Sequence, residues 1–144
     1  MPEFTTPATQ TPFIGQVLPR NNYDLGAVIS LAAAGAGTTT YRGYNTSGRG
    51  VIVVVDITAK TGTIDLVVSI YRRDKASNKR TLLLASASLT GIGTTTMKVH
   101  PTDVTDAANT AKKEFLGEEF EIEAVSGAGV TPAITATIVT CLVL

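Results

Sequence analysis

The sequence offers few side chains that could act as nucleophiles or as acid–base catalysts. It contains one histidine, His100, and one cysteine, Cys141, so an intrachain disulfide is excluded. Asp103 and Asp106 are the acidic residues nearest to His100 in sequence, and His100 is interpreted as a surface histidine at a strand end. Cys141 lies among Thr, Val and Leu with no neighbouring cation, a pattern typical of a buried, unreactive thiol. These residues indicate no catalytic centre.

Carboxylates gather near the C-terminal end of the chain, in residues 114–123. In a strand, alternate residues share a face, so three of these carboxylates are expected opposite Phe120, Ile122 and Ala124. Such a row could bind calcium or supply an acid–base pair. No calcium-binding loop accompanies it, and a solvated outer face is the favoured interpretation, with no metal or cofactor expected. The three residues are Glu119, Glu121 and Glu123.

Cations cluster around a polar hairpin loop predicted at residues 73–79. They could contact phosphates, but Tyr71 is the one aromatic residue beside them, which gives no support to base stacking. A basic loop and an acidic strand in one chain predict a polar contact between subunits or with an acidic shell surface. The basic candidates for this contact are Arg72, Arg73, Lys75, Lys79 and Arg80.

Pairs of glycines in residues 35–37, 48–50 and 91–93 resemble nucleotide-binding loops only superficially. Dinucleotide-binding and phosphate-binding loops lead into a helix, and no helical pattern follows any of these three. Tight turns between strands account for the glycines.

The elements that must position these side chains are short strands separated by Gly, Asn and Ser turns. Residues 49–58 are the strongest, because valines and isoleucines supply both faces. Residues 64–72 alternate with period two, and residues 102–118 are expected to form a long loop with one helical turn at most. The remaining strands are expected at residues 25–33, 38–44, 80–89, 94–99, 119–126 and 131–143.

This pattern predicts an all-β fold, an antiparallel β-sandwich or jelly roll of about seven to eight strands. Residues 51–55 and 82–84 offer more apolar strand surface than one thin sandwich can bury. We therefore expect a homo-oligomer, and we expect Val53→Lys to dissociate or misfold it. The apolar C-terminal residues 141–144 are expected to form part of a sheet.

Composition and charge limit the classes of partner. The chain of 144 residues has 12 basic and 12 acidic residues and a formal net charge of zero. This balance gives no general attraction to nucleic acid or anionic membranes, and near-zero charge favours association. The longest aliphatic run, residues 51–55, falls short of the roughly 20 residues of a membrane helix. The first residues lack the pattern of a secretory signal, so a cytosolic place of synthesis is expected.

Residues 1–22 are predicted to form an extended arm, and residues 23–144 the sandwich domain. Prolines at 2, 7, 12 and 19 prevent both helix and central strand. The arm is either a disordered tail or a segment that docks on a neighbour. Its apolar residues favour docking, and deletion of residues 1–20 is expected to weaken attachment without unfolding the domain. The candidate contacts in the arm are Phe4, Phe13, Ile14 and Val17.

Residues 48–101 contain the strand GVIVVVDIT and the double strand TLLLASASLTGIGTTTMKV, and a last strand ITATIVTCLV follows near the C-terminus. With these features the chain resembles a recurrent type of small bacteriophage virion protein, found among head decoration (cement) proteins and other minor structural components. The segment FLGEEFEIEA is more acidic here than its counterpart in that family. The resemblance implies no catalytic residues, and a location in the virion after synthesis in the host cytoplasm.

The leading hypothesis is a non-enzymatic capsid decoration subunit that binds the major capsid protein or other virion subunits, with no nucleic acid and no membrane as partner. A tail, collar or fibre component is the alternative of the same class. A carbohydrate-binding module is a further alternative, because sandwich folds often host one. Such modules present exposed aromatics, and this chain has no Trp, leaving Tyr23, Tyr41, Tyr44 and Tyr71 as candidates.

Overall fold

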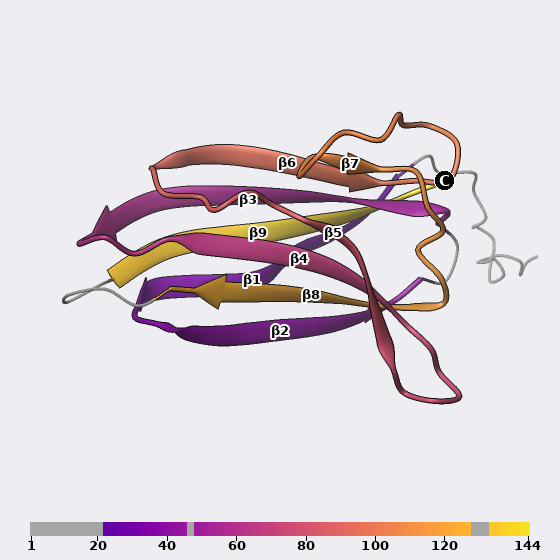
Figure 1. The fold of residues 1–144 in the computed structure, drawn as a ribbon, viewed down its shortest axis with the longest axis horizontal. Helices are drawn as coiled ribbons and strands as arrows, with labels where there is room; N and C mark the ends of the chain where they lie inside the picture. The colour runs from indigo at the N-terminus through magenta and orange to yellow at the C-terminus, as the bar shows by residue number, and fades with distance from the viewer. Residues whose placement is uncertain (1–21, 46–47, 128–132) are drawn as a thin grey trace, which may run out of the picture.

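A computed structural model describes residues 22–45, 48–127 and 133–144. The described residues form nine strands and no helix (Figure 1). Residues 102–118 form the expected long loop, which has no helical turn and contains the shortest strand. The strands are β1 (Asn22–Ala34), β2 (Gly37–Tyr44), β3 (Gly50–Thr61), β4 (Leu66–Arg73), β5 (Arg80–Ala85), β6 (Gly93–Val99), β7 (Ala111–Lys112), β8 (Glu119–Ser126) and β9 (Ala133–Val143).

The strands form two sheets that pack face to face, so the predicted β-sandwich is confirmed. Sheet B has the order β1-β9-β3-β6-β7, and sheet C has the order β2-β8-β4-β5. All pairings are antiparallel except that of β6 with the two-residue β7. With β7 set aside, the first strand pairs with the last, the second with the second-to-last, and so on inward to the β4–β5 hairpin. This nested order is that of a jelly roll.

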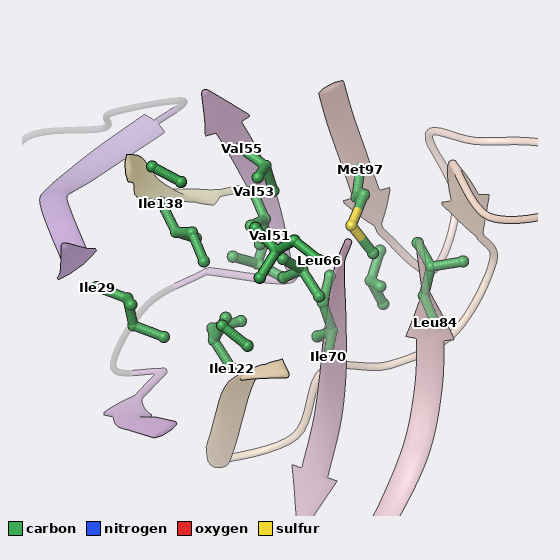
Figure 2. Packing of buried hydrophobic residues seen from close by; sticks show 14 of the residues in the cluster. Ile29, Val51, Val53, Val55, Leu66, Ile70, Leu84, Met97, Ile122 and Ile138 are labelled. Atoms are coloured by element: carbon green, nitrogen blue, oxygen red, sulfur yellow. The ribbon is translucent and has the colours of Figure 1, made fainter. Parts of the chain in front are cut away.

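The alternation of residue types along each strand decides which side chains enter the core. In β3, Val51, Val53 and Val55 are fully buried, whereas the residues between them face outward and are half-buried. Figure 2 shows these three valines facing Leu66 and Ile70 of β4 across the sandwich. The predicted inward set of residues 64, 66, 68 and 70 is likewise fully buried. Val53 therefore faces the core and not a partner, because it lies on the inner side of the pleat.

The strand formed by the last residues occupies an interior position in sheet B. β9 pairs with β1 on one side and with β3 on the other, which confirms that the C-terminal segment forms part of a sheet. Its inward residues Ile134, Ala136, Ile138 and Leu142 are buried against the opposite sheet. The predicted strand at residues 80–89 is shorter than expected. β5 ends at Ala85, and Leu89 makes a separate bridge to Leu66.

One inward residue of β9 is polar. Thr140 is fully buried, and its hydroxyl oxygen has no hydrogen-bond partner among the described residues. A buried hydroxyl that loses its water partners and gains none in exchange lowers stability. The unpaired Thr140 hydroxyl therefore lowers the stability of an otherwise apolar core.

We predict that Thr140→Val raises the free energy of unfolding by about 1 kcal/mol, because the change removes an unpaired hydroxyl and preserves the shape of the side chain. Chemical denaturation monitored by circular dichroism measures this. Thr137→Val is the matched control on the outer side of the same strand, and we expect its effect to stay within about 0.5 kcal/mol. A destabilised Thr140→Val variant would show that the Thr140 hydroxyl contributes to stability and would contradict this prediction.

Candidate assembly surface

The basic hairpin and the acidic strand predicted from sequence lie together on the outer face of sheet C. β8 lies between β2 and β4, and β5 follows β4. The register places Glu121 between Arg42 of β2 and Tyr71 of β4, and it places Tyr71 beside Leu82 of β5. In Figure 1 the loop that joins β4 to β5 projects beyond the rest of the sandwich. The structure thus brings the two charged segments into one continuous surface within a single chain.

The centre of this surface is a network of charge-assisted hydrogen bonds. Arg73 donates to Glu121 over 3.0 Å, and each of the two side chains is only 8% exposed. Arg80 crosses β4 to donate to Glu121 over 2.6 Å and to Glu123 over 2.9 Å. On the way its guanidinium lies 4.1 Å from the centre of the Tyr71 ring, a cation–π contact. Two arginines and two glutamates therefore neutralise one another.

Tyr71 completes the network from beneath Arg80. Its hydroxyl donates to Glu123 over 3.1 Å. Burial raises the pKa of Tyr71 above its ordinary value, and the neighbouring Glu123 carboxylate raises it further, because both disfavour the phenolate. Hydrogen bonds to Glu121 and Glu123 raise the pKa of Arg80, which keeps its charge fixed.

The remaining cations of the hairpin are mostly paired as well. Arg72 lies 3.5 Å from Glu114, and Lys75 lies 3.8 Å from Glu118, both in exposed settings. Lys79 is exposed and forms no ion pair with a described residue. Because their charges are neutralised within the chain, few of these cations remain to attract phosphates.

A local network shapes the tip of the hairpin. The Asp74 carboxylate accepts hydrogen bonds from the Ser77 hydroxyl and the Ala76 amide, over 2.7 and 2.9 Å. These bonds hold the pKa of Asp74 below its ordinary value, with the Ser77 contribution largest. Asn78 takes a positive φ of 59°, which asparagine tolerates better than most residues. The loop therefore has a defined turn and presents Lys79 at its base.

The expectation of a solvated acidic face is wrong for two of its three members. Glu119 and Glu121 are 9% and 6% exposed, and Glu123 is half-buried. They do lie opposite the buried Phe120 and Ile122, as alternation requires. Arg73 and Arg80 from other strands pair with Glu121 and Glu123, contacts that no local pattern reveals. Their predicted contact with another subunit stays a prediction.

His100 is not a surface histidine. It follows β6 but is only 3% exposed. Its Nδ1 accepts backbone hydrogen bonds from Thr102 and Asp103, over 3.2 and 2.9 Å, and its Nε2 lies 3.3 Å from a main-chain oxygen of Leu144. This geometry requires the proton on Nε2. The ring thus ties the loop after β6 to the end of β9, a structural role.

Cys141 also departs from its predicted environment. It is half-buried on the outer side of β9 and does not lie in the core. Its cross-strand neighbour on β3 is Ile52, and the pair Val54 and Val139 lies next to them in the same register. The apolar block is defined here as Ile52, Val54, Val139 and Cys141. It lies near the middle of the outer face of sheet B.

The apolar block is the feature that sequence reasoning found only in part. The valine-rich run in residues 51–55 indicated an outward apolar face of that strand. The contribution of β9 was missed, although burial alternates along it from Ala133 to Leu142. The candidate contacts Phe4, Phe13, Ile14 and Val17, and almost all of the predicted arm, lie outside the described residues.

The described residues show neither a cluster of metal ligands nor a membrane-spanning helix. No three His, Cys, Asp or Glu side chains within them gather as metal ligands would. Within the same residues, no helix has the length and apolar character needed to span a membrane.

We predict that Glu121→Gln lowers the free energy of unfolding by about 3 kcal/mol, because it leaves the buried Arg73 guanidinium without its carboxylate. Lys75→Ala removes an ion pair whose side chains are each 69% exposed, and it should cost less than about 0.5 kcal/mol. The double change Arg73→Met with Glu121→Leu should recover part of the loss. Thermal and denaturant melts test this, and equal effects of Glu121→Gln and Lys75→Ala would refute it.

Comparison with known proteins gives distant structural matches. No protein-family model matches the chain, and no curated protein matches its sequence. A structure of infectious bursal disease virus, Gx strain, is similar to 85% of this chain with a TM-score of 0.47 and 13% identity. The Gt strain of the same virus gives a TM-score of 0.42 and 12% identity over 85% of the chain. The matches span 32% and 33% of those longer chains, and at this level of similarity neither informs the function of the present one.

Proposed function

We propose that this chain is a structural subunit of a virion, of the head decoration (cement) type, that binds and stabilises a bacteriophage shell. The resemblance of residues 48–101 to small phage virion proteins supports this proposal. Those residues form β3, β4, β5 and β6, which include inner strands of both sheets. The jelly-roll order of the strands is also frequent among capsid proteins, although a fold alone does not fix a function.

The observation that carries the proposal is the apolar block on the outer face of sheet B. A sandwich that faces water on both sides places polar residues on its outer surfaces. The outer face of sheet C is mostly polar, with Arg, Glu, Tyr and Thr on its strands beside the exposed Leu82 and Val125. Sheet B instead presents Ile52, Val54, Val139 and Cys141 side by side. The four side chains are partly buried already, so covering what remains contributes about 0.5 kcal/mol each, and a partner that covers the apolar block gains about 2 kcal/mol from them.

The partner that we assign to the apolar block is a neighbouring subunit of the shell, such as the major capsid protein. A net charge of zero lets the chain approach such a surface without long-range repulsion. No step of this function requires catalysis, a cofactor, nucleic acid or a membrane. The location that follows is the virion. A tail, collar or fibre component would use the same surface, and the particle that the chain binds distinguishes these locations.

The arrangement of the tyrosines weakens the carbohydrate-binding alternative. Tyr41 is half-buried, with its ring centre 6.4 Å from that of Phe120, and Tyr71 lies under Arg80. Tyr44 is 59% exposed. Sugar-binding platforms need exposed aromatic rings, and two of the three tyrosines with described side chains are covered.

We predict that Val54→Lys abolishes binding to the shell and leaves the fold intact, because Val54 faces outward and a lysine there would lose its water on binding. The chain is co-expressed with the major capsid protein of the same genome, and its stoichiometry on purified shells is measured. Val125→Lys is the matched control, since Val125 is 39% exposed on the outer face of sheet C. It should bind like the wild type.

Two results would contradict the proposal. One is the absence of wild-type chain on the shells, and the other is equal binding by the Val54→Lys and wild-type chains. Binding to isolated tails in place of heads would move the subunit to the tail. A melting temperature close to that of the wild type confirms that Val54→Lys is folded, in contrast to Val53→Lys, whose lysine would enter the core.

A further inference from the structure

The four edges of the two sheets differ in how well they are protected against pairing with another strand. β1 shows three register shifts against β9, and Gly26 and Ala33 take positive φ values of 74° and 52°. β5 is short and its pairing with β4 contains one shift, while β7 has two residues. Irregular and short edge strands resist the addition of a further strand.

β2 has none of these protections. Its residues Gly37 to Tyr44 pair with β8 in an unbroken register of eight pairs. Most of its side chains are exposed, and within the described residues no strand pairs with its other side. Figure 1 shows β2 along the lower margin of the molecule. Its outward N–H and C=O groups therefore form a long, regular row that a further strand could complete.

Contacts on the inner side hold β2 in its extended form. The ring of Phe120 lies over Gly43 so closely that an added Cβ would come within 2.5 Å of it. Gly43 is buried, and Tyr41 packs against the same ring. Because the strand is already ordered, a partner that pairs with β2 does not bear the entropic cost of ordering it.

We propose that β2 pairs antiparallel with β2 of a second copy of this chain, about a twofold axis near Thr40, so that the two sheets C join into one continuous sheet. This inference deepens the proposed function, since it names the strand by which copies associate. This pairing of two copies does not cover the apolar block on sheet B.

The residues of β2 favour a second copy as the partner. With the axis at Thr40, Thr39 lies opposite Tyr41, and Arg42 lies opposite Thr38. Threonine and aromatic side chains are favourable in cross-strand pairs, and like charges directly opposite are avoided. Arg42 is the one charged residue of β2, so the pairing creates no repulsion. The net charge of zero on each copy removes long-range repulsion as well.

The arginine network in sheet C supplies a further reason. Arg80 belongs to a strand two positions from β8, yet it reaches Glu123 over 2.9 Å. In the paired arrangement Arg42 of the second copy also lies two strands from β8, on the opposite side. The register places it diagonally from Thr40, whose neighbour on β8 is Glu123. Glu123 thus gains a cation from the second copy, and the reverse holds by symmetry.

The test uses opposite charges at the axis. Thr40→Lys and Thr40→Glu are each expected to lose self-association, because the twofold axis places like charges opposite each other. Mixed in equal amounts they should associate again. Light scattering coupled to gel filtration measures the mass, which should fall from a multiple of 15.0 kDa to half that value in each single variant and return in the mixture. Thr96→Lys and Thr96→Glu, on an exposed threonine of β6, are the matched controls and should leave the mass unchanged.

Hydrogen exchange of the wild-type chain identifies the strand directly. The outward-facing β2 amides, which do not bond to β8, should become protected as protein concentration rises, and the same protection should appear in a chain that lacks residues 1–21. Loss of protection on that deletion would assign β2 to the N-terminal segment of a neighbour and overturn the inference. Association that survives Thr40→Lys would overturn it too, although shell binding through the apolar block would stand. A wild-type chain that stays monomeric at every concentration would overturn the β2 pairing and the expected self-association, whereas shell binding is measured separately.

Discussion

The architecture depends on the pairing of β9 with both β1 and β3. Without β9, β1 would have no neighbour in sheet B, because its one pairing in that sheet is with β9. The inward residues of β9, including Ile138 and Leu142, also fill the core opposite sheet C. In this nested strand order, every pairing except the β4–β5 hairpin joins segments that are far apart in sequence. Such non-local order makes folding slow relative to helical domains, and it couples the chain ends to the stability of the whole sandwich.

Strand positions were predictable because alternation is a local property of the sequence. The buried residues Leu66, Val68 and Ile70 and the two-faced β3 could be read from period two alone. The order of strands could not, since nothing local in β9 states that it enters between β1 and β3. The same limit explains the error at His100. Its burial results from Leu144 and the loop after β6, which meet only in the folded chain.

For the charged residues too, sequence alone predicted which face they occupy, but it did not predict their contacts in the folded chain. Alternation placed Glu119, Glu121 and Glu123 on one face, and that placement is correct. The exposure of Glu121 and Glu123 depended on Arg73 of β4 and Arg80 of β5, which pair with them in the folded chain. Arg73 and Arg80 consequently form ion pairs within their own chain. A nucleic-acid phosphate would have to displace these carboxylates in order to bind the two arginines. This competition makes a phosphate-binding role unfavourable, as does the net charge of zero.

The two outer faces of the sandwich are built for different surroundings. Most charged side chains at the centre of sheet C pair with one another, while sheet B carries the apolar block, which the proposed shell contact would cover. β2 is an edge strand of sheet C, so its free N–H and C=O groups point outward in the plane of that sheet and away from both outer faces. A contact through the apolar block and a contact through the β2 edge therefore need not compete for space. A subunit with two such independent surfaces can bind a shell and a second copy at once, and each contact then raises the effective concentration for the other.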